Sequence, residues 1–270
     1  MFTKRIQVYL SKPEHYSAVA GSVRVTPFGA DSVSRRGIIT ASQTANVLSL
    51  GYQTRERFLK SLTPGYQDLG NLPSDFEVNA KNHGHKFEKE AALLFQERMR
   101  HRLKPLTRSD EQLTFTMAFE GADKPFHVGA TPDQVYLDEE KHQMNLLEIK
   151  CPYRKWLDQS DISIEDEAWS LVSDKHYIQC QMQLLITKLK EMYLFFYVPR
   201  RDDAKSENTA LWLVREDPAF QEFLLANIEQ AYREIRNNFT SQYKTIRNEG
   251  THNRTITSES KTRHCTFLIP

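Results

Sequence analysis

A chain of 270 residues can form one large domain or two small ones, and its 39% hydrophobic and 26% charged residues are ordinary for a soluble globular protein. No apolar run approaches the ~18 residues of a membrane-spanning helix, and the N-terminus lacks the apolar region of a secretion signal. The net charge of +1 excludes a globally basic nucleic-acid-binding protein. Three cysteines without a CxxC pair exclude a disulfide framework and a cysteine-bound zinc or iron–sulfur cluster, and they indicate a reducing compartment.

Lysine and arginine gather at the two ends of the chain. They outnumber the acidic residues in 1–36 and again in 231–270, so the middle of the chain is acidic overall. One interpretation is a central acidic site that holds metal ions, with basic ends that grip a polyanion. The alternative, that both ends are simply solvated, stays equally open at this point.

One long helix dominates the predicted N-terminal half. The predicted elements are loop or extended chain at 17–34, a short helix at 39–51 capped near Thr40 or Ser42, a turn-rich connector at 65–75, and a helix from about Glu77 to Leu103. Phe87, Ala91 and Phe95 recur at helical spacing, so one face of the long helix is expected to pack on the core.

Strands dominate the rest of the chain. The predicted elements are strands at 112–120, 126–137 and 144–150, a polar irregular stretch at 155–174, a helix from His176 to Lys190, strands at 192–198 and 210–217, and a helix from Pro218 to about Tyr243. Residues 245–264 are polar and mildly basic and are expected to be mobile, whereas the apolar end CTFLIP is expected to dock on the core or on a partner.

This order of elements predicts an α/β fold with a small mixed central sheet flanked by helices. The expected organisation is an N-terminal extension at 1–34, one folded domain at 35–244, and a basic polar tail at 245–270.

The strongest functional signal is a predicted hairpin that joins Thr131-Pro132-Asp133 to Glu148-Ile149-Lys150. Side chains alternate along a strand, so Glu148 and Lys150 point the same way, and a hairpin tip at 138–141 returns the chain so that Asp133 lies beside Glu148. Two carboxylates and an ammonium would then converge on a site that suits a divalent metal, a water molecule and phosphodiester hydrolysis. The residues alone do not separate this site from an ordinary hairpin ion pair.

Three further sets of residues are candidates, each with an ordinary structural alternative. Glu88 lies at the edge of the buried face of its helix, or is merely a solvated helix residue. Gln179 and Gln183, one helical turn apart, could bind phosphate or water, or only join helices. Arg35 with Ser42 beside a helix start could form a phosphate pocket, or belong to the basic surface.

Taken together, these segments resemble the phage lambda exonuclease, or YqaJ-type viral recombinase, family of PD-(D/E)xK nucleases. The segments that carry the resemblance are RRGIITASQTANVL (35–48), EVNAKNHGHKFEKEAALLF (77–95), GATPDQV (129–135), LLEIKCPY (146–153), HYIQCQMQLLIT (176–187) and MYLFFYVPRR (192–201). They follow the family's order and span about residues 35–240, which makes 35–244 a nuclease domain with a PD-(D/E)xK restriction-endonuclease-like core.

The resemblance implies a role for each candidate. The implied metal ligands are Asp133, Glu148, the carbonyl of Ile149, Glu88 and Asp123. Lys150 orients or activates the attacking water, and two bound metal ions would lower its pKa. The implied 5′-phosphate and DNA contacts are Arg35, Ser42, Gln179 and Thr131, where Thr131 keeps the hydroxyl of a serine in the phage enzyme.

The activity implied is two-metal hydrolysis with Mg²⁺, for which Mn²⁺ would substitute. The enzyme would digest one strand of linear duplex DNA 5′→3′ from 5′-phosphorylated ends and leave 3′ overhangs for recombination or end processing. The family also implies a homotrimer and a single-strand annealing partner. The expected location is intracellular, in the cytoplasm, or in the nucleus if the host or virus is eukaryotic. The alternatives are a PD-(D/E)xK endonuclease of repair or restriction type, and a nonenzymatic DNA-binding module.

Overall fold

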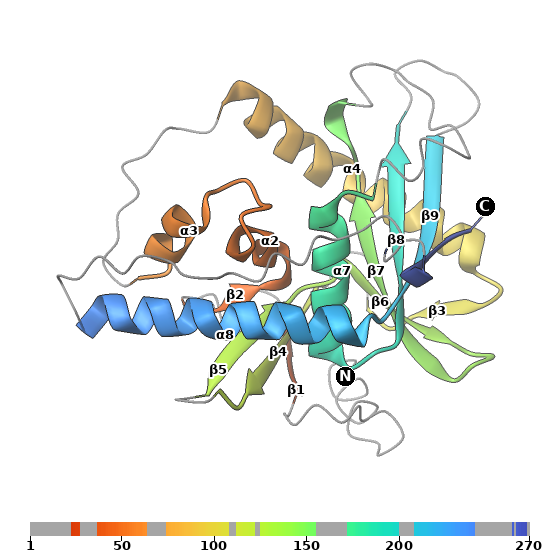
Figure 1. Ribbon diagram of the computed structural model, residues 1–270. Coiled ribbons are helices and arrows are strands. Elements are labelled where there is room, and N and C mark those ends of the chain that lie inside the picture. The colour runs from red at the N-terminus through yellow and green to blue at the C-terminus, as the bar shows by residue number, and fades with distance from the viewer. Residues whose placement is uncertain are drawn as a thin grey trace.

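Two sheets and the helices around them form the part of the chain that the computed structural model describes, namely residues 23–27, 37–63, 74–107, 112–121, 125–154, 172–199, 208–240, 261 and 263–268. Figure 1 shows the two sheets and the helices that cover them. Within these residues, no helix is both long enough and apolar enough to cross a membrane.

The larger sheet has six strands in the order β10-β9-β8-β7-β6-β3. Its strands are β3 (Leu103–Pro105), β6 (Gln134–Asp138), β7 (Gln143–Lys150), β8 (Glu191–Val198), β9 (Asn208–Arg215) and β10 (Cys265–Leu268). β7 and β8 run parallel, whereas the other neighbouring strands are antiparallel. The sheet is therefore mixed, as predicted.

The smaller sheet has the order β1-β4-β5-β2. Its strands are β1 (Val23–Pro27), β4 (Leu113–Phe119), β5 (Phe126–Ala130) and β2 (Ile39–Thr40). β2 pairs with β5 in parallel, and the other two pairings are antiparallel. β2 leads directly into a 3₁₀ turn, η2 (Ala41–Gln43), and into α2 (Thr44–Val47), which α3 (Arg55–Ser61) follows.

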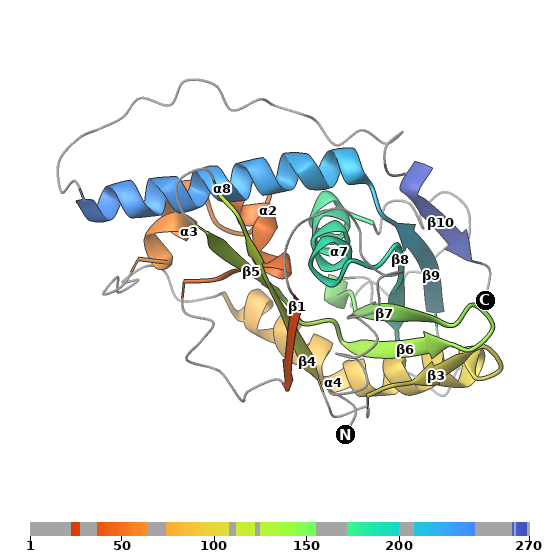
Figure 2. The ribbon, with the colours of Figure 1, turned by 90° about the horizontal axis from the view of Figure 1, so that it is seen from below.

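Helices cover both faces of the six-stranded sheet. In Figure 2, α4 (Asp75–Met99) lies below the sheet and α7 (Asp174–Thr187) above it, with α8 (Pro218–Thr240) beyond α7. Phe95 of α4 packs with Leu147 and Ile149 of β7 in one apolar cluster, whereas Leu146 of β7 belongs to a second cluster with α7 and α8. Alternate residues of β7 thus face opposite helices, and this alternation turns Glu148 towards α7.

Local side-chain contacts explain where these helices begin. Ser74 accepts a hydrogen bond from the backbone of Glu77 at the start of α4, and Ser173 does the same for His176 at the start of α7. At η2, the Gln43 side chain accepts from the backbone of Thr40 at 3.2 Å, so the predicted cap at Thr40 is confirmed.

Several elements differ from the prediction, among them β2, which replaces the start of the helix predicted at 39–51, and α3, which was not predicted. Residues 126–137 form two strands, β5 and β6, in different sheets, because Pro132 lacks an N–H and interrupts the ladder. The long helix ends at Met99, and β3 follows at Leu103–Pro105. Val23–Pro27 pairs with β4, which confirms extended chain, one of the two alternatives predicted for this segment. Cys265–Leu268 pairs with β9, so the expected docking of the apolar end on the core is confirmed, and it takes the form of an ordered strand.

Asp138 is expected to stabilise the hairpin that carries the candidate site. Its buried carboxylate accepts hydrogen bonds from the backbone N–H groups of Glu140 and Lys141 and from Arg102 at 2.9 Å. Burial alone would raise the pKa of Asp138, but the hydrogen bonds from Lys141 and Arg102 lower it below its ordinary value. Its contribution to stability is therefore lost as the pH falls through this lowered pKa.

Asp138→Asn should lower the free energy of unfolding at neutral pH by about 2 kcal/mol, because it removes the charge that these donors face. Glu139→Gln is the matched control. Glu139 pairs with Lys104 on the exposed surface, where such pairs contribute under about 1 kcal/mol. Denaturant unfolding of the two variants checks this, and equal losses in both would contradict it.

Candidate active site

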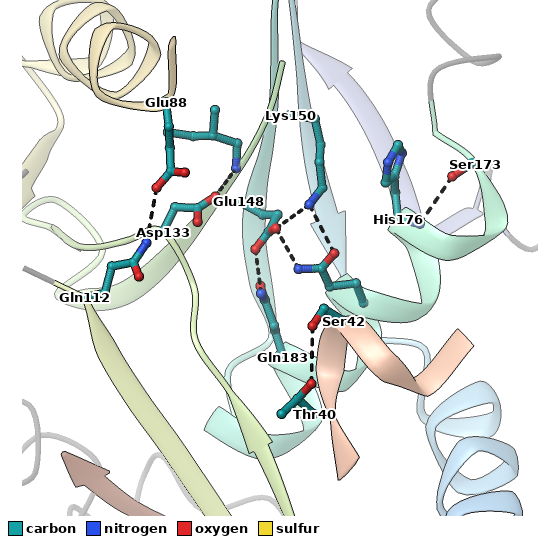
Figure 3. A network of polar contacts seen from close by, with 12 residues as sticks. Thr40, Ser42, Glu88, Gln112, Asp133, Glu148, Lys150, Ser173, His176 and Gln183 are labelled. Carbon is teal, nitrogen blue, oxygen red and sulfur yellow. Dashed lines mark hydrogen bonds and ion pairs between the residues drawn. The ribbon is translucent and has the colours of Figure 1, made fainter. Parts of the chain in front are cut away.

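The hairpin of β6 and β7 brings Asp133 next to Glu148. Asp133 precedes β6, and its backbone N–H donates to the carbonyl of Leu147 at 3.0 Å. Its Oδ2 accepts the backbone N–H of Ile149 at 2.6 Å. The carboxylate is thus tied to the residue between Glu148 and Lys150 (Figure 3). Asp133 and Glu148 therefore lie close together, as predicted from the sequence, because the register of the hairpin pairs their strands at this point.

Glu148 is the centre of a polar network between β7 and α7. Only 4% of its surface is exposed. Its Oε1 accepts hydrogen bonds from Lys150 Nζ at 2.5 Å and from Gln179 Nε2 at 2.6 Å, and its Oε2 accepts from Gln183 Nε2 at 2.6 Å. Lys150 Nζ also donates to Gln179 Oε1 at 3.1 Å. Figure 3 shows the lysine and the amides converging on this one carboxylate.

Glu88 approaches the same region from α4. Gln112, just before β4, donates from Nε2 to Glu88 Oε1 at 3.1 Å, and His85 Nδ1 lies 3.9 Å from Glu88 Oε2. Burial raises the pKa of Glu88 above its ordinary value, and repulsion from Glu148 adds to this effect. Glu88 therefore belongs to the electrostatic environment of Glu148, although they sit on different elements.

Burial and repulsion between like charges make the ionised forms of Asp133 and Glu88 less favourable. Burial raises the pKa of Asp133 well above its ordinary value, and repulsion from Glu148 and then Glu88 raises it further. Burial would lower the pKa of Lys150, but attraction to Glu148 and Asp133 raises it above its ordinary value. The protein alone thus shows the opposite of the lowered lysine pKa expected beside two metal ions, because bound cations would repel the ammonium, whereas the carboxylates attract it.

The chemistry of this group fits a hard divalent cation. Asp133, Glu148 and Glu88 supply carboxylate oxygens, the ligands that Mg²⁺ and Mn²⁺ prefer, and a cation would relieve their mutual repulsion. Among the residues that the structure describes, no three His, Cys, Asp or Glu side chains are already grouped as a metal cage. Oε1 of Glu148 already accepts hydrogen bonds from Lys150 and Gln179, so a cation that binds this oxygen must displace one of these contacts.

This geometry lies within a segment that matches a known family. The family model of the YqaJ-like viral recombinase domain matches residues 33–190, which is more than half of the chain. The chain belongs to this family. The match covers Glu88, Asp133, Glu148 and Lys150, and also the part of α7 that carries Gln179. No curated protein sequence matches the chain significantly.

Two solved structures share the fold of this member of the YqaJ-like family. LHK-Exo, an alkaline exonuclease from Laribacter hongkongensis, superposes with a TM-score of 0.50 at 15% identity over 77% of this chain and 92% of the other. The same enzyme in complex with dAMP gives a TM-score of 0.50 at 16% identity over the same shares. A phage-related exonuclease from Haemophilus somnus 129PT gives 0.46 at 12% identity, over 76% and 96%. The predicted PD-(D/E)xK-like α/β fold class is confirmed.

The expected phosphate contacts of this family member are placed only in part. Ser42 is exposed in η2, with its Oγ 3.2 Å from Thr40 Oγ1, and η2 packs against α7 (Figure 3). Thr131 lies in the connection from β5 of the smaller sheet to β6 of the larger sheet, and its Oγ1 is 3.3 Å from Thr114 Oγ1. Gln179 contacts Glu148 and Lys150 directly. Arg35 and Asp123 lie outside the described residues.

One contact in this site, the hydrogen bond from Gln112 to Glu88, could not be predicted from the sequence. Gln112 is a single amide before a strand, and no spacing or motif distinguishes it. Its partner is 24 residues away on another element. Only the tertiary structure, which brings the residue before β4 next to α4, reveals the pair.

Proposed function

We propose that the chain is a metal-dependent 5′→3′ DNA exonuclease that digests one strand of linear duplex DNA from 5′-phosphorylated ends and leaves 3′ overhangs. One observation carries the proposal: buried Glu148 and partly buried Asp133 lie beside Lys150, with Glu88 in electrostatic contact, in a YqaJ-like chain. An ordinary hairpin ion pair needs one acid and one base, and does not account for three buried or partly buried acids whose charges repel one another.

Asp133, Glu148, Glu88 and the carbonyl of Ile149 would hold two Mg²⁺ ions, with Asp123 as a further candidate outside the described residues. When bound, these ions polarise the scissile phosphate and neutralise its developing charge. Lys150 holds and orients the attacking water and donates hydrogen bonds from its ammonium group. Gln179, which contacts both Lys150 and Glu148, keeps that ammonium aimed at the reacting group.

Recognition of the 5′-phosphate is assigned to Arg35, Ser42 and Thr131, with Gln179 at the border of the two sites. The complex of LHK-Exo with dAMP supports a DNA-derived ligand, because dAMP is the kind of mononucleotide that a DNA exonuclease releases. The proposed enzyme is an intracellular homotrimer. It acts on double-stranded DNA ends together with a single-strand annealing protein.

A time course on linear duplex DNA labelled at either the 5′ or the 3′ ends, with and without Mg²⁺, tests this function. Mg²⁺-dependent release of 5′-labelled mononucleotide before any 3′ label is expected, together with faster attack on 5′-phosphate than on 5′-hydroxyl ends. A closed circular duplex serves as the control and should remain intact. Cutting of the circle would instead indicate an endonuclease, and binding of ends without cleavage would indicate a DNA-binding module.

Arg35→Ala should mainly remove the preference for 5′-phosphorylated ends. A bidentate charge-assisted contact to phosphate contributes about 1.5–3 kcal/mol, so the rate on phosphorylated ends should fall on the order of 10–100-fold. The rate on 5′-hydroxyl ends should change little. Initial rates of both substrates measured side by side check this prediction. An equal loss on both would show that Arg35 has a structural role.

A further inference from the structure

Gln183 donates a hydrogen bond to the carboxylate oxygen of Glu148 that Lys150 does not contact. It lies on α7, one helical turn after Gln179, and no part of its surface is exposed. Its Nε2 donates to Glu148 Oε2 at 2.6 Å, whereas Gln179 and Lys150 both donate to Oε1 (Figure 3). The two amides, spaced by one turn, thus hold the two oxygens of a single carboxylate.

The unpaired oxygen of the Gln183 amide indicates that the contact with Glu148, rather than packing, accounts for this side chain. Gln183 Oε1 is buried and has no hydrogen-bond partner among the described residues. Turning the amide over would place this oxygen against the carboxylate, so the contact with Glu148 fixes its orientation. An apolar side chain of similar size would fill the space without burying an unpaired acceptor. Packing alone therefore does not account for a glutamine here, whereas the carboxylate does.

Gln181, two residues earlier, shows how a purely structural amide on the same helix behaves. It is equally buried, but its Nε2 donates to the carbonyl of Arg215 at 2.8 Å, and its Oε1 accepts the backbone N–H of Asp217 at 2.8 Å. Gln221 adds a third hydrogen bond at 3.2 Å. Both ends of this amide are satisfied by the connection between β9 and α8, away from Glu148.

We infer that Gln183 is a positioning residue that holds Glu148 in the orientation needed to bind a divalent cation. The inference rests on the proposed function, and it adds a residue for which neither the motif nor the family match gives a role. A carboxylate oxygen has two lone pairs. Oε1 already accepts two hydrogen bonds and Oε2 accepts one, so the oxygen that Gln183 orients retains a lone pair for a further ligand.

The test compares Gln183→Met with Gln181→Met, which are near-isosteric replacements at buried positions of one helix. Mn²⁺ binding is measured by calorimetry without DNA, and thermal unfolding is measured in the presence of a chelator. Gln183→Met should weaken Mn²⁺ binding about 10–100-fold, the usual cost of losing a partner that orients a metal ligand. Gln181→Met should lower the unfolding temperature and leave the Mn²⁺ affinity of the folded protein unchanged.

Each outcome separates this inference from the proposed function. Unchanged Mn²⁺ affinity in Gln183→Met, with wild-type binding intact, overturns the positioning role and leaves the nuclease proposal standing. If the wild-type protein binds no Mn²⁺, the metal-dependent function fails and the cation-binding part of this inference fails with it, and a double-mutant cycle of Gln183→Met with Glu148→Gln then tests only whether Gln183 orients Glu148. Non-additive unfolding temperatures in the chelator then support the orienting contact, whereas additive ones overturn it.

Discussion

Lys150→Ala is expected to lower the rate of DNA cleavage on the order of 1,000-fold, while the protein still binds duplex ends. A side chain that positions a proton or stabilises charge in the transition state commonly contributes this much. The ammonium of Lys150 is committed to Glu148 and Gln179 within the site, so it is not expected to anchor the DNA. Single-turnover rates on 5′-phosphorylated duplex and gel-shift binding of the same DNA measure the two properties.

Loss of metal would not explain such a result. Lys150 and a cation compete for the same carboxylates, because attraction to Glu148 and Asp133 is what raises the pKa of the lysine. Removing the ammonium should therefore leave Mn²⁺ affinity equal or higher. Lys141→Ala is the matched control, since Lys141 lies on the same hairpin and pairs with Glu191 at 2.6 Å, at the end far from the site. Near-normal cleavage by Lys150→Ala would show that the lysine is misassigned.

The core of this site could be predicted from sequence because the information is local. Alternation along β7 sets the common direction of Glu148 and Lys150, and the polar tip at 138–141 returns the chain to Asp133. Helical periodicity places Glu88 and Gln179 on their helices in the same way. Their approach to Glu148 is not local, because it depends on how α4 and α7 pack beside β7.

The second sheet and the two outer strands could not be predicted for the opposite reason. Pro132 marks a break in the ladder, but nothing nearby says that the two halves of 126–137 join different sheets. Val23–Pro27 and Cys265–Leu268 are too short to be recognised as strands alone, and each becomes one through a distant partner, β4 or β9. The unequal roles of Gln181 and Gln183 likewise depend on which neighbour each amide meets.

Asp133→Asn should strongly lower the rate of metal-dependent cleavage and, without metal, make the protein more stable. Lewis-acid stabilisation is worth several kcal/mol, so losing a ligand should lower the cleavage rate on the order of 1,000-fold. Burial and then repulsion from Glu148 and Glu88 raise the pKa of Asp133 well above its ordinary value. Between the unfolded and folded pKa values, the folded state binds more protons, so its stability falls as the pH rises.

Asparagine keeps an oxygen for the N–H of Ile149 but carries no charge, so Asp133→Asn should gain about 1 kcal/mol at neutral pH. The gain should shrink towards acidic pH, where Asp133 is protonated in both states. Asp138→Asn, at the other end of β6, should show the opposite sign, because Asp138 has a lowered pKa and faces donors. Thermal unfolding with a chelator at pH 5 and pH 8 tests both signs.

Added Mn²⁺ should then stabilise the wild type more than Asp133→Asn, since a cation that binds only the folded state raises its stability. A loss of stability in both variants would mean that Asp133, like Asp138, serves the fold rather than the cation.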